Sequence, residues 1–204
     1  MSKLVFLLLF FYSTIISAQT NKHSERDLKK MIDSLTRIEA VDTFLNYSLT
    51  CIGGMRIDTC NYYDPLYLFW TQDGKTFLKK FDDCQFYKSV LLDSTNPLKF
   101  YMTYKSQINR EQIKPPTYIQ SKKGNVVTEI SSSIDHTCYY EMTFIINSEK
   151  TFKRVSDYDL NFIKFDNGKK NMYYNYNRQT KLKSLIDKID ELLKQLYGQT
   201  NDAQ

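Results

Sequence analysis

Residues 66–81 read LYLFWTQDGKTFLKKF, and this stretch predicts the fold more strongly than any other part of the chain. Its two strand-like runs, 66–71 and 75–81, are rich in apolar and aromatic residues and are separated by a turn at Asp73-Gly74. An Asp-Gly turn between two such runs is the sequence signature of a β-hairpin. The stretch therefore predicts two antiparallel strands and a sheet built around them.

Other strand-like runs extend this sheet along the chain. We expect strands at 86–92, 126–134, 137–146 and 151–155, and a second hairpin that joins 160–165 to 171–176 through an Asp-Asn-Gly turn. Strands that are close in sequence and joined by tight turns pair in the antiparallel direction. The sheet is therefore expected to be mainly antiparallel.

Two amphipathic helices are predicted near the ends of the chain. Apolar residues recur at helical spacing in two sets, Leu28, Met31, Ile32, Leu35 and Ile38, and Leu182, Leu185, Ile186, Ile189, Leu192, Leu193 and Leu196. The first helix is expected to continue, or to restart at Asp42, as far as Leu49, and another helix begins near Pro97. These elements predict an α+β class, with the sheet packed by the N-terminal and C-terminal helices.

The first 18 residues have the three parts of a cleavable secretory signal peptide. Lys3 gives a short basic start, residues 4–12 form an apolar run, and Ser17-Ala18 are small residues before the cleavage position. The apolar run is shorter than the roughly 20 residues that span a bilayer. Gln19 stands where a bacterial lipoprotein has Cys. We therefore expect export to the periplasm or the extracellular space, with no lipid anchor and no membrane insertion of the mature chain.

The mature chain, residues 19–204, is expected to form one domain that ends in a polar tail at 199–204. All four cysteines lie in this part, and an even number in an oxidising compartment indicates disulfides. The sequence leaves three pairings open, of which we favour a local Cys51–Cys60 bond and a long-range Cys84–Cys138 bond. The chain has no Cys-x-x-Cys zinc motif. We expect a disulfide-stabilised fold without a metal or other cofactor.

The charge distribution gives little support to nucleic-acid binding. The chain carries 28 Lys and Arg against 23 Asp and Glu, and the formal net charge of +5 is spread along the sequence. Nucleic-acid-binding domains concentrate basic residues in a patch or stripe. We therefore expect no nucleic-acid partner.

Two groups of residues are candidates for a functional site. His136 and Cys138 are two apart and would share a face of a strand, so they could form a thiolate–imidazole pair. No orienting group accompanies them, and a disulfide is the more expected state of Cys138. Tyr174 and Tyr176 would likewise share a strand face and are a candidate binding surface. No known catalytic or nucleotide-binding motif occurs in the sequence.

The functional expectation is an exported, non-enzymatic domain that binds a protein partner in the periplasm or outside the cell. Two alternatives stay open. One is a small thiol-dependent hydrolase that uses Cys138 and His136, and the other is a small-ligand carrier with a pocket between the sheet and a helix.

Overall fold

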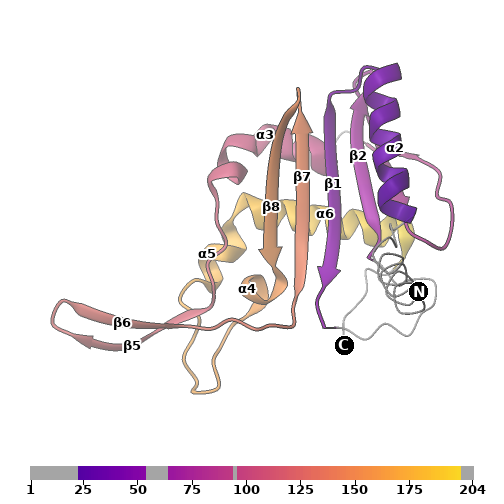
Figure 1. Ribbon diagram of the computed structural model, residues 1–204. Coiled ribbons are helices and arrows are strands. Elements are labelled where there is room, and N and C mark those ends of the chain that lie inside the picture. Colours follow the sequence, from indigo (N-terminus) through magenta and orange to yellow (C-terminus); the bar gives the residue numbers. More distant parts are fainter. Residues whose placement is uncertain (1–22, 54–63, 94–95, 199–204) are drawn as a thin grey trace, which may run out of the picture.

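A six-stranded antiparallel sheet forms the centre of the fold in the computed structural model, which describes residues 23–53, 64–93 and 96–198 (Figure 1). The strand order is β4-β3-β2-β1-β7-β8, and each neighbouring pair is antiparallel. The predicted hairpin is confirmed, with Asp73 and Gly74 at positive φ in its turn. The strands of this sheet are β1 (Thr43–Cys51), β2 (Leu66–Gln72), β3 (Lys75–Phe81), β4 (Val90–Leu91), β7 (Cys138–Ile146) and β8 (Glu149–Ser156).

Helices cover the two faces of the sheet unequally. α3 (Pro97–Arg110) and α6 (Lys181–Tyr197) pack together on one face, whereas α2 (His23–Ile38) lies on the other face over β2 and β3 (Figure 1). Side chains alternate between the two faces of a strand, so even-numbered residues of β2 face α2 and odd-numbered residues face α3 and α6. The predicted N-terminal and C-terminal amphipathic helices are both present.

Each face of the sheet has its own hydrophobic core. On the α3 and α6 side, the rings of Tyr101 and Phe144 stack with centroids 3.6 Å apart, and both side chains are fully buried. On the other side, Leu28 and Leu35 of α2 pack in one cluster with Trp70 of β2. Burial of one such large side chain contributes about 2 kcal/mol. The two cores therefore hold the helices of both faces against the sheet.

A second, two-stranded sheet projects from the body of the molecule as an arm (Figure 1). It consists of β5 (Thr117–Lys123) and β6 (Val126–Ser131), which pair antiparallel. Every residue of β6 is exposed. We call this hairpin, residues 117–131, the arm. β6 lies within the predicted strand at 126–134, whereas β5 is not predicted by the sequence.

Three expectations differ from the structure in whole or in part. The segment 42–49 is not a helix but most of β1, because β2 and β7 pair with it on both sides. The segment 86–92 contains only the two-residue β4. The second hairpin keeps its turn at Gly168, but only one antiparallel bridge, Lys164 with Lys170, forms beside it. The short helices α4 (Asp157–Asn161) and α5 (Tyr174–Gln179) take up the outer parts of the two expected strands.

The predicted signal peptide, residues 1–18, and the polar tail, residues 199–204, lie outside the described residues. Within the described ranges, no helix has the length and apolar character that crossing a membrane requires.

Candidate functional site

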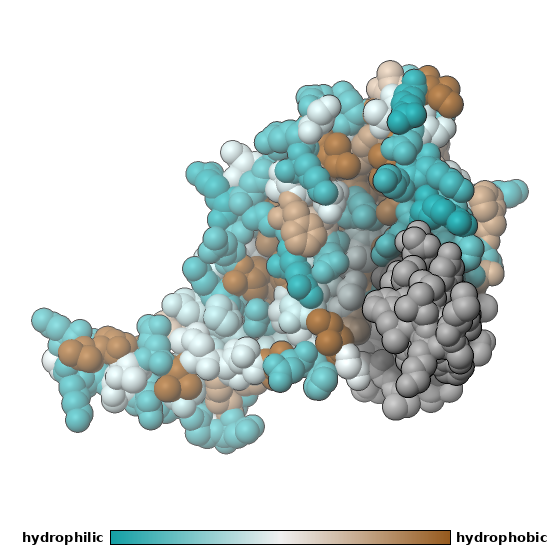
Figure 2. Space-filling view, in the orientation of Figure 1, coloured by the Kyte–Doolittle hydropathy of each residue, from teal (hydrophilic) through white to brown (hydrophobic). Residues whose placement is uncertain are grey.

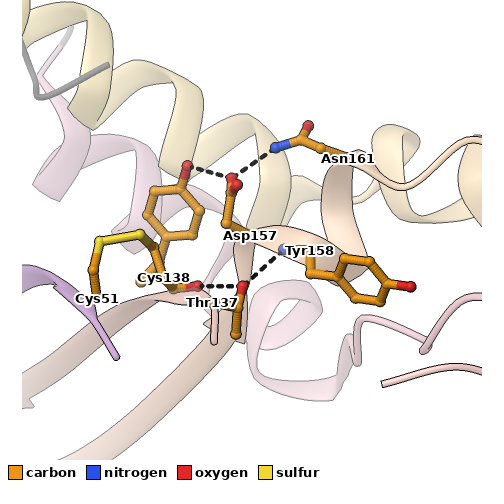
Figure 3. The surroundings of a disulfide bond; sticks show 7 residues. Cys51, Thr137, Cys138, Asp157, Tyr158 and Asn161 are labelled. Atoms are coloured by element: carbon orange, nitrogen blue, oxygen red, sulfur yellow. Dashed lines mark hydrogen bonds between the residues drawn. A yellow bond between two sulfur atoms is a disulfide. The ribbon is translucent and has the colours of Figure 1, made fainter. Parts of the chain in front are cut away.

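A disulfide joins the last residue of β1, Cys51, to the first residue of β7, Cys138. The two residues are direct partners in the register of the sheet, with Cα atoms 3.9 Å apart. They are 87 positions apart in the sequence, so the bond ties two distant parts of the chain at one end of the sheet. Figure 3 shows the surroundings of this bond, with Thr137 directly before Cys138 in the chain.

The cysteine pairing expected from the sequence is wrong. Cys51 is bonded to Cys138 rather than to Cys60, and Cys138 is therefore not bonded to Cys84. The short spacing of Cys51 and Cys60 in the sequence favours a local bond. The pairing of β1 with β7 instead places Cys51 directly opposite Cys138. Cys60 lies outside the described residues.

The His136–Cys138 pair does not form a nucleophilic site in the oxidised chain. A cysteine in a disulfide has no thiolate with which to attack a substrate. The His136 ring instead packs against the backbone of Gly53, where an added Cβ would lie 2.0 Å from Nδ1 of His136. Gly53 also has φ of 85°, so this approach requires glycine. The disulfide therefore argues against a thiol hydrolase that uses Cys138.

Tyr174 and Tyr176 lie in α5 rather than in a strand. Residues two apart on a helix do not share a face, so the expected two-tyrosine strand surface is absent. Tyr176 is exposed and Tyr174 is half-buried. A binding role for either residue stays a prediction.

A buried polar cluster that the sequence does not predict lies between the sheet and α6. The hydroxyl of Tyr47, in β1, donates a 2.6 Å hydrogen bond to Oδ1 of Asp190, in α6. Burial is the main cause that raises the pKa of Asp190 to about 6, and the nearby Asp187 carboxylate adds to it. Burial, and then the negative charge of Asp190, raise the pKa of Tyr47 well above its usual value. The spacing of Asp190 and Lys194 in the sequence predicts only an i,i+4 pair within the helix.

The cluster continues from β7 into α4. The Tyr140 hydroxyl donates a 3.0 Å hydrogen bond to Asp157, the first residue of α4, and Asp157 also accepts one from Asn161 (Figure 3). Burial first, and then the carboxylates of Asp190 and Asp157, raise the pKa of Tyr140. On α6, Lys183 forms an ion pair with Asp187.

This cluster has the chemistry of a proton donor but lacks a described route to a substrate. A carboxyl group with a pKa near 6 can exchange a proton near neutral pH. Of two surface grooves, one is lined by residues of β8 and the other by residues of β4. Neither Tyr47 nor Asp190 lines either of them. We therefore interpret the cluster as an internal connection that joins β1, β7, α4 and α6.

Half of the sheet face on the α2 side is not covered by any helix that the structure describes (Figure 1). We call this surface the β7–β8 face, and it consists of Tyr139, Glu141, Lys150, Phe152 and Arg154. The guanidinium of Arg154 lies 3.9 Å from the centroid of the Tyr139 ring, and its Nε lies 3.1 Å from a carboxylate oxygen of Glu141. Phe152 is 55% exposed. Figure 2 shows hydrophobic and hydrophilic residues mixed over this part of the sheet.

The groove beside β8, of about 360 Å³, lies between this strand and residues 111–113. Two of its polar residues, Glu111 and Lys153, already have partners within the fold. The carboxylate of Glu111 accepts hydrogen bonds from the backbone N–H groups of Lys181 and Leu182, at the start of α6. Lys153 donates to the carbonyl oxygen of Glu111 and to that of Asn109 at the end of α3. This groove therefore reflects how the helix ends are capped.

The groove beside β4, of about 420 Å³, lies between this strand and the later half of α6. Its polar lining includes Asp93, Lys188 and Glu191, and its apolar lining includes Leu92 and Leu192. A volume of this size is in the range of small-ligand sites.

No cluster of three or more potential metal ligands occurs in the described ranges. Comparison of the chain with protein-family models, with curated proteins and with solved structures gives no match. The functional proposal therefore rests on the geometry of this molecule.

Proposed function

We propose that this chain is an exported, non-enzymatic domain that binds a protein partner through the β7–β8 face. The main support is that this sheet surface is uncovered and exposes Phe152. Next to Phe152 on the same strand, the Arg154 side chain is held by the Tyr139 ring and the Glu141 carboxylate. Aromatic residues and Arg are enriched at protein–protein interfaces and supply most of their binding energy.

The fixed position of Arg154 favours binding. A long side chain usually loses about 1 kcal/mol of conformational freedom when a partner immobilises it. The stacking of Arg154 on Tyr139 and its ion pair with Glu141 hold it in place before a partner arrives. The cost of ordering this side chain is therefore largely met within the free protein.

The charges of the β7–β8 face indicate the chemistry of the partner. Lys150 and Arg154 lie on the same side of β8 as Phe152, two residues before and after it, because strand side chains alternate. Glu141 offsets the charge of Arg154, and Lys150 adds a further positive charge. The matching surface is a protein with an apolar centre for Phe152 and carboxylates beside it.

The expected compartment is consistent with the disulfide. Bonds such as Cys51–Cys138 persist in oxidising compartments and are rare in the reducing cytosol. Together with the signal-like residues 1–18, this supports export to the periplasm or the extracellular space.

A pair of matched variants tests the proposal. Phe152→Ala removes the exposed aromatic group of the β7–β8 face, and Phe86→Ala removes an 83% exposed aromatic group elsewhere. The immobilised mature chain is incubated with the envelope fraction of its host, and bound proteins are quantified by mass spectrometry. We expect one protein whose capture falls about tenfold with Phe152→Ala, the size of a typical interface anchor, and is unchanged with Phe86→Ala. Equal capture by all three forms would contradict the proposal.

A small-ligand carrier is the second candidate, favoured by the 420 Å³ groove between β4 and α6. Its mixed lining of Lys188, Glu191 and Leu192 suits an amphipathic molecule. Thermal-shift screening of lipids and sugars against wild type and Leu192→Trp tests it. A carrier should show a ligand whose stabilisation disappears in the filled-groove variant.

A further inference from the structure

The outer edge of β5 in the arm is already occupied. The backbone N–H of Met172 donates a 2.8 Å hydrogen bond to the carbonyl of Thr117, and Lys169 donates to the carbonyls of Ile119 and Gln120. The Tyr118 ring meets the Phe165 ring edge to face, with centroids 4.6 Å apart. The loop at 163–172 therefore fixes the arm from one side.

The outer edge of β6 is open. β6 pairs with β5 along one edge, and no backbone hydrogen bond within the described part of the chain reaches its other edge. Its apolar side chains are also exposed, with Val126 at 68% and Val127 at 44%. Figure 2 shows hydrophobic residues along the projecting arm.

An open, β-branched strand edge is a template for pairing with another strand. Proteins usually block such an edge with Lys, Pro, a bulge or a covering loop. The six residues of β6 contain no Lys and no Pro, and the register shift of the arm lies in β5 near Gln120. The edge of β6 is thus exposed and already extended, so it is suited to pair with an added strand from another molecule.

We infer that the arms of two copies of this chain pair antiparallel through their β6 edges and form a four-stranded sheet. The inference uses a different surface from the β7–β8 face and does not rest on the proposed function. A symmetric pair has a two-fold axis perpendicular to the sheet. In an antiparallel ladder, hydrogen-bonded pairs alternate with non-hydrogen-bonded pairs. An axis between two neighbouring pairs would make a pair of one kind equivalent to a pair of the other kind, so the axis must pass through a pair. That pair consists of one residue and the same residue of the other copy.

The sequence of β6 selects which residue that is. Centring on Thr128 or on Glu129 gives the longest overlap of the two six-residue strands. The Glu129 register places two carboxylates directly opposite each other, which is unfavourable. The Thr128 register places Thr128 opposite Thr128 and Val126 opposite Ile130 on one face, and Val127 opposite Glu129 on the other. Paired β-branched residues stabilise such ladders, so the strand is complementary to itself.

The positions of the basic residues are compatible with this pairing. Lys122 and Lys123 pair with Val127 and Val126 inside the arm, so they lie on β5, one strand away from the shared edge. The lysine beside the arm base, Lys169, contacts β5 rather than β6. The two shared edges therefore approach each other without opposing lysines.

The expected association is weak. Pairing over residues 126–130 buries much less than the roughly 1,200 Å² of a stable complex. A concentration-dependent equilibrium between monomer and dimer is therefore the expected behaviour, and not a permanent dimer.

Cysteine cross-linking tests the register directly. In the Thr128 register the two copies of residue 128 are direct neighbours, so Thr128→Cys should form an intermolecular disulfide when oxidised glutathione is added. Lys122→Cys, exposed on the other strand of the arm, is the matched control. Peptide mapping should find a 128–128 link that forms at least about five times faster than the 122–122 link, since only the first is held at a paired position. Equal rates would overturn the inference.

Sedimentation equilibrium of the oxidised mature chain tests the association itself. Wild type should show a dimer at about 0.5 mM, a concentration chosen for a weak interface. Val126→Lys puts a charge on the shared edge and should weaken the dimer at least about tenfold, whereas Ile119→Lys, on β5, should not. A strictly monomeric wild type, or equal effects of the two lysine variants, would overturn the inference. Unchanged capture of a partner through Phe152 would then leave the proposed function standing.

Discussion

The Tyr47 hydroxyl donates a 2.6 Å hydrogen bond to the carboxyl group of Asp190, and this bond joins the central strand β1 to the C-terminal helix α6. Tyr47 is 1% exposed, so the bond lies inside the fold. A buried polar group costs stability unless it has a partner. Tyr47 and Asp190 satisfy each other, and each depends on the other for its place in the core.

The raised pKa of Asp190 predicts a specific pH dependence. The ordinary pKa of this carboxyl is 3.8, and in the folded protein it is about 6. Between these values the folded state binds more protons than the unfolded state, so stability falls as the pH rises. We expect wild type to lose about 2 kcal/mol relative to Asp190→Asn between pH 4 and pH 7, a value reduced for partial exposure.

Urea unfolding of both proteins at pH 4, 5, 6 and 7 measures this difference. The amide that replaces the carboxyl group in Asp190→Asn does not titrate, so subtraction removes the contribution of every other ionisable group. Parallel pH profiles for the two proteins would contradict a raised pKa of Asp190 in the folded state.

Removal of the disulfide should destabilise the protein strongly. In the chain-entropy model, a bond between residues 87 positions apart contributes about 4.6 kcal/mol. The double variant Cys51→Ala/Cys138→Ala should show this loss in denaturant unfolding. Reduced wild type also lacks the disulfide and serves as the reference. Its free energy of unfolding should be lower than that of oxidised wild type by at least the same amount.

Disulfide mapping without reduction checks the same feature. We expect a peptide pair that links Cys51 to Cys138. Recovery of a Cys51–Cys60 peptide would contradict the register of β1 and β7.

The parts of the fold that could be predicted are those whose information is local. The turn residues of 66–81 and the helical spacing of 182–196 each specify one element without reference to the rest of the chain. By contrast, residues 42–49 carry apolar residues at spacings that suit a helix. This segment is nevertheless a strand, because β2 pairs with it on one side and β7 on the other.

The candidate sites depended on contacts that no local pattern contains. Cys51 meets Cys138 only because β1 pairs with β7, and Tyr47 meets Asp190 across 143 positions only because α6 lies against the sheet. The arm could be predicted only in part, since β6 is β-branched while β5 is polar towards its tip. The β7–β8 face was not predicted, because its composition differs little from that of any solvent-facing strand.

The cap that Glu111 provides should be measurable as stability. Its carboxylate accepts hydrogen bonds of 3.1 and 2.8 Å from the backbone N–H groups of Lys181 and Leu182. A negative charge at this end of α6 also interacts favourably with the helix dipole. Glu111→Ala should cost about 1–2 kcal/mol, and Glu111→Gln should cost less because it keeps a hydrogen-bond acceptor. Urea unfolding at neutral pH gives both values, and equal losses would contradict the charge contribution.

Site-specific photo-cross-linking tests the central claim, that the β7–β8 face binds a protein. A photoreactive phenylalanine analogue replaces Phe152 in one sample of the mature chain and Phe86 in another, and both are irradiated with the host envelope fraction. We expect a covalent adduct with one protein from position 152 and none from position 86. No adduct at position 152, or the same adducts at both positions, would contradict it.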